Sequence, residues 1–94
     1  MADGRIIFEW HDEALADYLH WQKHNKNVAE RIDRLLADIR LHPFEGIGKP
    51  KPLRGNLRSY WSRRIDEENR LVYVVKENNI IEIRSCRSHY KFSP

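Results

Sequence analysis

The sequence contains one cysteine, Cys86, and no run of apolar residues long enough to cross a membrane. A single cysteine cannot form a disulfide within the chain, whereas small secreted domains usually depend on several disulfides. The N-terminal residues MADGRIIFEW also lack the basic start and the long apolar segment of a secretory signal. These absences argue against secretion and membrane insertion, and we expect a cytoplasmic protein with no membrane partner.

Clusters of metal-ligating residues are also missing from the sequence. The carboxylates Asp66, Glu67 and Glu68 stand together, but no histidine or cysteine pattern surrounds them with the spacing of a metal site. We therefore expect no metal and no other cofactor, so that any chemistry must come from the side chains.

The chain does have an uneven distribution of charge. Residues 1–47 contain six Lys and Arg against nine Asp and Glu, whereas residues 48–94 contain eleven against five, which gives net charges of −3 and +6. The basic half begins with GKPKPLRGN (48–56), a loop with three cations and two prolines. This polarity favours a polyanionic partner such as nucleic acid, although a basic half is also common on a solvated surface.

The length of 94 residues suits one domain, over residues 1–94, and the apolar pattern predicts its elements. Residues 5–10 alternate like a strand, and two helices follow, the second with Asn25 or Asn27 as its N-cap and Pro43 beyond its end. Segments 59–65, 70–76 and 79–87 are rich in β-branched and aromatic residues. We expect an α+β fold in which the N-terminal strand and a two-helix hairpin pack on an antiparallel sheet of about four strands.

One face of this sheet is expected to be partly free of helices. If Asn78 and Asn79 form a two-residue turn and Arg64 lies opposite Arg70, side-chain alternation brings several charged residues together there. The face would then carry Arg64, Arg70 and Arg87, with Glu68 and His89 at its edge, and it would also carry Val72, Val74 and Ile83, so that part of it must be covered. The three tryptophans, Trp10, Trp21 and Trp61, are expected to pack in the core or the helical hairpin.

Three motifs point to a known family: FEGIGKPKPL (44–53), YWSRRIDEENRLVY (60–73) and CRSHY (86–90). They closely resemble the YoeB/Txe toxins of bacterial type II toxin–antitoxin systems, within the RelE superfamily. The likeness extends from about Ile7 to Tyr90 and includes HWQKHNK in the helical hairpin, and residues 91–94 follow it as a short C-terminal extension. It implies a RelE-like, microbial-ribonuclease-like fold.

The resemblance also implies an activity and partners. The family toxins are mRNA interferases, which cleave mRNA in the ribosomal A site without a metal and so inhibit translation. The expected partners are therefore the ribosome with its mRNA and ribosomal RNA, and an acidic antitoxin of the YefM/Axe kind. Operator DNA would be bound through the toxin–antitoxin complex alone, and homodimerisation is left open.

Roles for individual residues come from the same resemblance. Arg70 matches the arginine that binds the scissile phosphate, His89 the general acid, and Tyr90 the aromatic residue that stacks on or orients the substrate nucleotide. Arg64 and Arg54 match phosphate-contacting cations, and Glu68 matches a glutamate that orients Arg70 or His89. The residues alone also allow Arg70 to be a surface ion pair. The residues alone do not decide whether four further cations belong to an RNA-binding surface or to a solvated one, namely Lys49, Arg58, Arg63 and Arg87.

Lys51 departs from the family pattern. The YoeB toxins have a glutamate at this position, which is assigned as the base that activates the 2′-OH, and a charged lysine only donates hydrogen bonds. Either Lys51 acts as a neutral amine, because the cations Arg54, Arg64 and Arg70 favour loss of its proton, or catalysis is weakened.

Three functions stay open on the sequence. The first is a ribosome-dependent endoribonuclease, and the second is a weakened or inactive relative that mainly binds the antitoxin. The third is a same-fold toxin that inhibits a protein target without catalysis. The His89-Tyr90 pair after Cys86-Arg87-Ser88 favours the first over the third.

Overall fold

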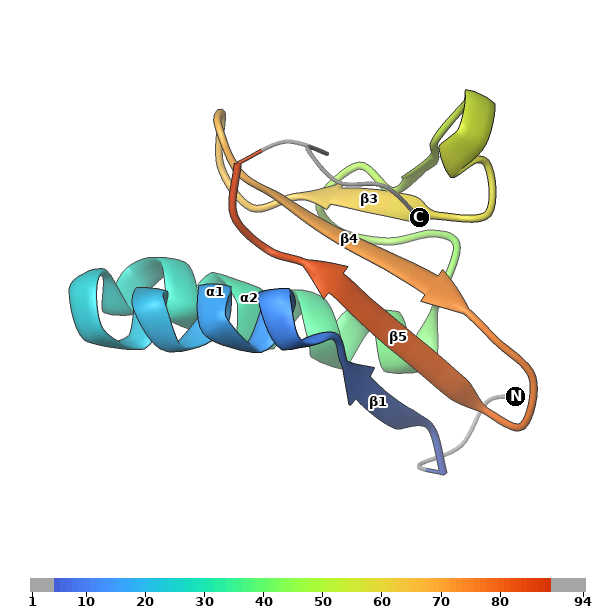
Figure 1. The fold of residues 1–94 in the computed structure, drawn as a ribbon, viewed down its shortest axis with the longest axis horizontal. Coiled ribbons are helices and arrows are strands. Elements are labelled where there is room, and N and C mark those ends of the chain that lie inside the picture. The colour runs from blue at the N-terminus through green and yellow to red at the C-terminus, as the bar shows by residue number, and fades with distance from the viewer. Residues whose placement is uncertain (1–4, 89–94) are drawn as a thin grey trace.

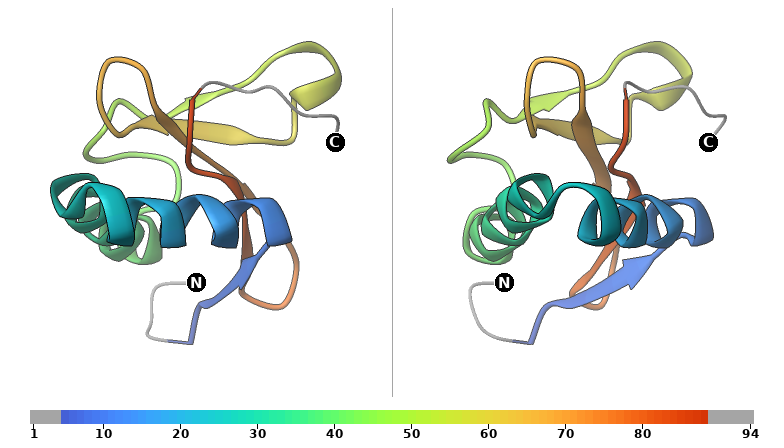
Figure 2. Two further views of the ribbon diagram at one scale, coloured as in Figure 1. Left: turned by 60° about the vertical axis from the view of Figure 1, so that its left-hand side comes forward. Right: turned by 90° about the vertical axis from the view of Figure 1, so that its left-hand side faces the viewer.

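The computed structural model describes residues 5–88, which form one sheet with two helices on one of its faces (Figures 1 and 2). The elements in chain order are β1 (Ile7–Trp10), α1 (Asp12–His24), α2 (Lys26–Leu41), β2 (Lys51–Pro52), a short 3-10 helix (Gly55–Leu57), β3 (Trp61–Arg64), β4 (Arg70–Val75) and β5 (Ile80–Ser85). The expected α+β fold is confirmed. Within residues 5–88, no helix is both long enough and apolar enough to cross a membrane.

Both helices begin at residues whose side chains cap them. The His11 Nδ1 accepts a hydrogen bond from the Glu13 N–H at 3.1 Å, and the Asn25 side chain accepts one from the Val28 N–H at 3.3 Å. Asn25 also ends α1, because its own N–H donates to the Trp21 carbonyl at 2.8 Å. One residue thus joins the two helices, and the predicted cap at Asn25 is confirmed.

The sheet differs from the expected one in strand number and direction. It has five strands in the order β1-β5-β4-β3-β2, and β1 pairs in parallel with β5 while the other pairs are antiparallel. β2 was not predicted because it has two residues, too few to leave a periodic pattern. The parallel pair was missed because pairing direction depends on the path of the helical hairpin, not on local sequence.

A register shift separates the two ends of the β4–β5 ladder. Asn78 and Asn79 lie in the turn between β4 and β5, with positive φ angles of 61° and 62°. Val75 pairs with Ile81 and the Lys76 N–H donates to the Ile80 carbonyl at 2.8 Å, so the turn has three residues, 77–79, and the expected two-residue turn is wrong. Tyr73 then lies opposite Ile83, but Val72 lies opposite Ser85, so one extra residue bulges from β5. The three-residue turn sets Ile83 opposite Tyr73 instead of Val74, and the extra residue restores the expected register at Val72 and Ser85. The expectation that Ile83 shares a face with Arg70 is therefore wrong, since Ile83 joins the core against the helices.

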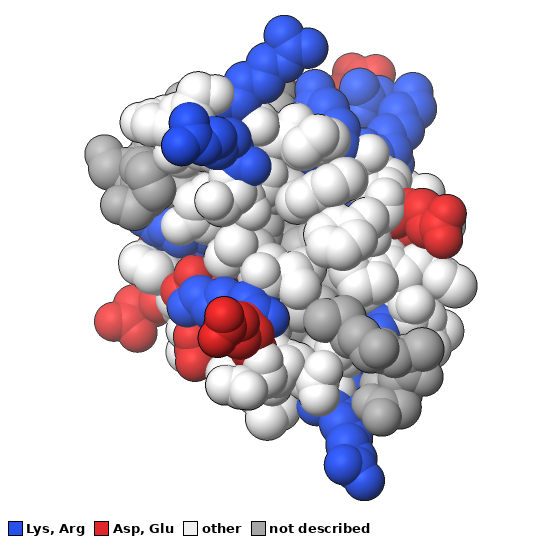
Figure 3. Space-filling model, turned by 90° about the vertical axis from the view of Figure 1, so that its right-hand side faces the viewer, with Lys and Arg blue, Asp and Glu red and all other residues white. Residues whose placement is uncertain are grey.

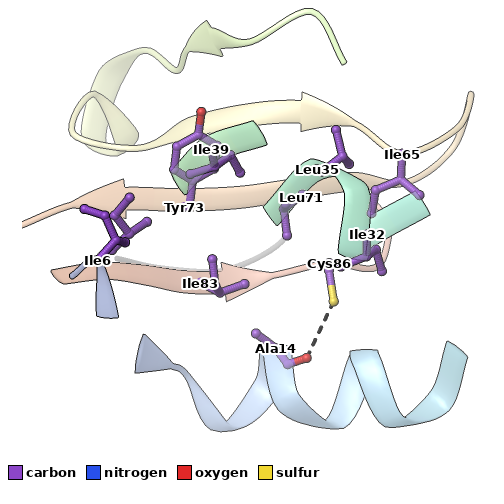
Figure 4. Packing of buried hydrophobic residues seen from close by; sticks show 11 residues of the cluster. Ile6, Ala14, Ile32, Leu35, Ile39, Ile65, Leu71, Tyr73, Ile83 and Cys86 are labelled. Carbon is purple, nitrogen blue, oxygen red and sulfur yellow. Dashed lines mark hydrogen bonds between the residues drawn. The ribbon is translucent and has the colours of Figure 1, made fainter. Parts of the chain in front are cut away.

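The core lies between the helices and the sheet (Figure 4). Its eleven buried residues are Ile6, Ala14, Ile32, Leu35, Ile39, Ile65, Leu71, Tyr73, Ile81, Ile83 and Cys86. Trp10, Trp21 and Trp61 pack against this cluster, as predicted. The Trp21 indole N–H also donates to the Cys86 carbonyl at 2.8 Å, which ties α1 to the end of β5. This core leaves the other face of β3 and β4 for the site.

Candidate functional site

Three predicted site residues share the sheet face that points away from the helices. Lys51 lies opposite Ser62, and Arg64 lies opposite Arg70. Directly paired residues point to the same side of a sheet, and so do residues two positions apart on one strand. Lys51, Arg64 and Arg70 therefore lie on one face, and the predicted Arg64–Arg70 pairing is confirmed. Val72 lies on the same face and is fully buried, so part of that face is covered, as expected.

The Arg70 guanidinium is held by the main chain of the loop that precedes it. Its Nη1 donates to the carbonyl oxygens of Asp66 at 2.6 Å, Asn69 at 3.0 Å and Glu67 at 3.3 Å. These contacts fix the direction of a half-exposed cation whose planar fork suits a phosphate. Glu68 lies in the same loop with an exposed side chain, and its role in orienting Arg70 or His89 stays a prediction.

Asp66 organises this loop. Its Oδ1 accepts hydrogen bonds from the N–H groups of Asn69 at 2.7 Å and Glu68 at 2.9 Å, and both of its oxygens accept from the Asn69 Nδ2 at 3.1 Å. Partial burial raises the pKa of Asp66, but these hydrogen bonds and the charge of Arg70 outweigh it and hold that pKa below its usual range. The loop is therefore an ordered turn built on an ionised carboxylate.

The same loop contacts the chain next to two further predicted residues. The Ser88 N–H donates to the Asn69 Oδ1 at 2.6 Å, and the Arg70 N–H donates to the Ser88 carbonyl at 3.0 Å. Ser88 is the residue before His89 and Tyr90, which lie outside the described residues. The part of the predicted site that the structure describes thus ends at this pair of hydrogen bonds.

A cleft lies beside Lys51 and Arg54. It has a volume of about 580 Å³, and its described lining consists of Lys51, Pro52, Leu53, Arg54 and Leu57. Lys51 and Arg54 are exposed, and Lys49 lies just before β2 with a positive φ of 51°. On the face shown in Figure 3, Lys and Arg side chains gather mainly in the upper part, at the height of β3 and the 3-10 helix in Figure 1. A cleft with cations at its rim can bind an extended polyanion.

Arg63 does not belong to this surface, contrary to one reading of the sequence. It is fully buried on the helix side of β3 and forms an ion pair with Asp38 of α2. Its guanidinium also donates to the carbonyl oxygens of His42, of Glu45 at 2.8 Å and of Ile47 at 3.1 Å. The Nε donates to the Tyr73 hydroxyl at 3.2 Å. Arg63 therefore fastens the chain after α2, which leads into the basic loop.

Arg87 also lies elsewhere than expected. Its guanidinium carbon is 5.9 Å from the centre of the Trp21 ring on α1, a cation–π contact. Arg87 lies beyond the end of β5 at Ser85, where the regular alternation of a strand no longer applies. Arg58 is exposed at the end of the 3-10 helix.

Sequence reasoning missed the residues that fasten the loop before β2, namely Asp38, Tyr73 and the glycines Gly46 and Gly48. A Cβ on Gly46 would lie 1.9 Å from the Asp38 Oδ2, and one on Gly48 would lie 2.8 Å from the Leu35 Cδ2. The available signal was the alternation along β3. If Arg64 points to the open face, its neighbour Arg63 must point to the core and needs a buried acid.

Comparison with known proteins gives a consistent family. A family model described as a YoeB-like toxin of bacterial type II toxin-antitoxin system matches residues 10–90. Toxin YoeB of Escherichia coli (strain K12) is 49% identical over 81 residues, which cover 86% of this chain and 95% of that protein.

Solved structures agree with this result. The YoeB dimer from Staphylococcus aureus has a TM-score of 0.84 and 43% sequence identity, covering 93% of this chain and 100% of that chain. A YoeB-YefM complex from the same organism has a TM-score of 0.82 and 44% identity, with the same coverage. With matching motifs, fold and length, the chain belongs to the YoeB-like toxins of bacterial type II toxin–antitoxin systems.

Proposed function

We propose that this toxin is a ribosome-dependent endoribonuclease that cleaves mRNA in the ribosomal A site without a metal and so inhibits translation. The observation that supports this most directly is the register of β2, β3 and β4. It puts Lys51, Arg64 and Arg70 on one face of the sheet, beside a cleft of about 580 Å³. Two arginines on one rigid surface can hold a phosphodiester and the charge that develops on it, with Lys51 on the same face.

The chemistry requires three groups. A base takes the proton of the 2′-OH, whose oxygen then bonds to phosphorus as the bond to the 5′-oxygen breaks, and an acid protonates that leaving oxygen. The products are a 2′,3′-cyclic phosphate and a 5′-hydroxyl. Arg70 and Arg64 stabilise the phosphorane, His89 is the acid, and Tyr90 orients the nucleotide. Arg54 and Lys49 bind the RNA backbone at the loop.

Lys51 is the base candidate of this site. It lies on β2 opposite Ser62, with an exposed side chain at the cleft. A neutral amine can take the proton of the 2′-OH. A lysine that stays protonated leaves Arg70 and His89 to act without a base, which gives weak but measurable cleavage.

The deciding experiment compares Lys51→Glu with Lys51→Ala in a single-turnover assay on mRNA bound to ribosomes. Loss of about 10²-fold or more in both variants identifies Lys51 as the base. Lys76→Ala is the matched control, because it removes one lysine that pairs with Glu9 and Glu82 away from the cleft. A large gain in Lys51→Glu would instead mean that the present chain is a weakened enzyme.

The weakened enzyme is the second candidate function, and Lys51 is the observation that favours it. Such a chain would mainly bind its antitoxin. Mapping the 5′ ends of mRNA from a translation reaction with and without the protein distinguishes the two. New ends within ribosome-bound codons support the ribonuclease, and their absence together with tight antitoxin binding supports the second candidate.

The proposed partner is an acidic antitoxin of the YefM kind, encoded beside the toxin, that binds across the basic half and covers the site. Residues 48–94 carry a net charge of +6, so the complex should weaken as salt is raised. Operator DNA would be bound through this complex and not by the toxin alone. Binding confined to the helices, with no salt dependence, would contradict this mode of inhibition.

A further inference from the structure

We propose that Asn69 is a positioning residue, which fixes the main chain at Ser88 and thereby couples the residues after it to Arg70. The proposal rests on the proposed ribonuclease function for its catalytic consequence. The anchoring itself is argued from contacts within residues 66–88.

Asn69 is held from one side and holds Ser88 on the other. Its Nδ2 donates to both carboxylate oxygens of Asp66 at 3.1 Å, and its Oδ1 accepts from the Ser88 N–H at 2.6 Å. The amide group is thereby oriented by a charged acceptor before it meets the main chain of Ser88. An alanine at position 69 would lose all of these contacts.

Ser88 needs such an anchor. Its φ of 54° lies in the left-handed region, which is unfavourable for a residue other than glycine. Both of its main-chain polar groups are bonded to consecutive residues, the N–H to the Asn69 side chain and the carbonyl to the Arg70 N–H at 3.0 Å. The chain is therefore fixed in an unfavourable conformation one peptide bond before His89.

One short loop thus controls two parts of the proposed site. The loop carbonyls of Asp66, Glu67 and Asn69 hold the Arg70 guanidinium, and the Asn69 side chain holds Ser88. The acid and the phosphate-binding cation must be placed relative to each other within a fraction of an ångström. Asn69 links them through contacts that leave the RNA untouched, so it acts through Ser88 and Arg70.

The test uses the full chain and three variants. Asn69→Ala removes the anchor. Asp66→Asn with Asn69→Asp exchanges the carboxylate and the amide, so that position 66 can donate and position 69 can still accept from Ser88. Glu77→Ala is the control, because it removes one negative charge from the turn between β4 and β5.

Two readouts separate positioning from a general structural role. Hydrogen exchange of the Ser88 amide reports the anchor, and single-turnover cleavage of ribosome-bound mRNA reports its consequence. We expect Asn69→Ala to speed Ser88 exchange and to lower cleavage, each by about tenfold or more, while the melting temperature changes by a few degrees. The exchanged pair should recover most of both effects, and Glu77→Ala should match the wild type.

Several results would overturn the proposal. If the Ser88 amide exchanges at the wild-type rate in Asn69→Ala, Asn69 does not anchor Ser88. If cleavage stays within twofold of wild type despite faster exchange, the anchor has no effect on catalysis. A failure of the exchanged pair to recover either readout would also overturn the proposal.

If the wild-type chain cleaves no mRNA, the proposed function fails, while the positioning proposal is then decided by Ser88 exchange and by the ring resonances of His89. The His89→Gln variant identifies these resonances. If they do not change in Asn69→Ala, the proposal is overturned.

Discussion

Arg63 and Arg64 are consecutive residues of β3, yet the two faces of the sheet give them opposite environments. Arg63 is fully buried against α2, with an ion pair to Asp38 and hydrogen bonds to the Tyr73 hydroxyl and three main-chain carbonyls. Arg64 is exposed on the other face, opposite Arg70. A buried cation must be paired at every polar atom, whereas an exposed one keeps its charge for a ligand.

The comparison separates a structural side of the sheet from the side proposed to bind RNA. On the helix side, Arg63 pairs with Asp38 and binds the main chain that leads to the basic loop. On the open side, Arg64 and Arg70 share a face with Lys51, which lines the cleft. Arg63 and Arg64 therefore have different roles only because strand alternation points them to opposite faces.

The largest expected effect comes from removing the buried arginine. Arg63→Ala should lower the free energy of unfolding by about 3–5 kcal/mol, because Asp38 and three carbonyls lose their donor. Arg64→Ala should change it by less than about 0.5 kcal/mol. Urea denaturation followed by circular dichroism measures both. Equal losses in the two variants would contradict the division between the faces.

For cleavage, in contrast, we expect large effects from residues of the open face. Arg70→Ala should lower single-turnover cleavage on the ribosome by on the order of 10²-fold, and Arg64→Ala by about tenfold, because these cations act on the transition state. His89→Ala should match Arg70→Ala. Near-normal rates in Arg70→Ala or His89→Ala, with the fold intact, would mean that the site lies elsewhere.

A substitution at Gly46, in the loop between α2 and β2, tests how tightly Arg63 and Asp38 are packed. Gly46 has a φ of +120°, and an added Cβ would lie 1.9 Å from the Asp38 Oδ2, which Arg63 holds in place. Gly46→Ala should therefore cost about 2–3 kcal/mol of stability. Gly55→Ala is the control, because its φ of +66° is also positive but nothing lies within 4 Å of the new Cβ. Its cost should be about 1 kcal/mol.

The smallest effect is the dependence of this environment on pH. Partial burial raises the pKa of Asp38, but hydrogen bonds from Arg63 and the Ile47 N–H, with the charge of Arg63, outweigh it and lower that pKa below its ordinary value of 3.8. A depressed carboxyl pKa adds stability above the unfolded value, and this stability is lost as pH falls through the folded value.

The stability difference between wild type and Asp38→Asn should accordingly be constant near neutral pH and shrink below about pH 4. Denaturation at pH 7, 5 and 3 measures it. A difference that grows on acidification would have the wrong sign for an ionised Asp38.

Local patterns predicted much of the fold and part of the site. The cap at Asn25 and the place of the turn at Asn78 and Asn79, though not its length, are short-range features that residue types specify directly. The pairing of Arg64 with Arg70 was assumed for the loop between two strands, and the structure has that pairing. These features needed no information about distant residues.

Features that depend on distant contacts were not predicted. The turn after β4 has three residues instead of the expected two, which misplaced Ile83. Arg87 lies beyond the end of β5 and contacts Trp21, which strand alternation does not predict. Burial of Arg63 depends on Asp38, which is 25 positions away. The alternation along β3 could have indicated that Arg63 is buried, but it does not identify Asp38 as the partner.

The parallel pairing of β1 with β5 has a consequence for biosynthesis. It sets Ile7 beside Ile80, so β1 pairs with a strand that is made after all the other described helices and strands. At about 5–20 residues per second, translation of these 94 residues takes on the order of 5–20 s. During most of this time, β1 and the helical hairpin exist without the central strands β4 and β5. The toxin therefore cannot complete its sheet, and with it the Ser88 anchor, before β5 has been synthesised.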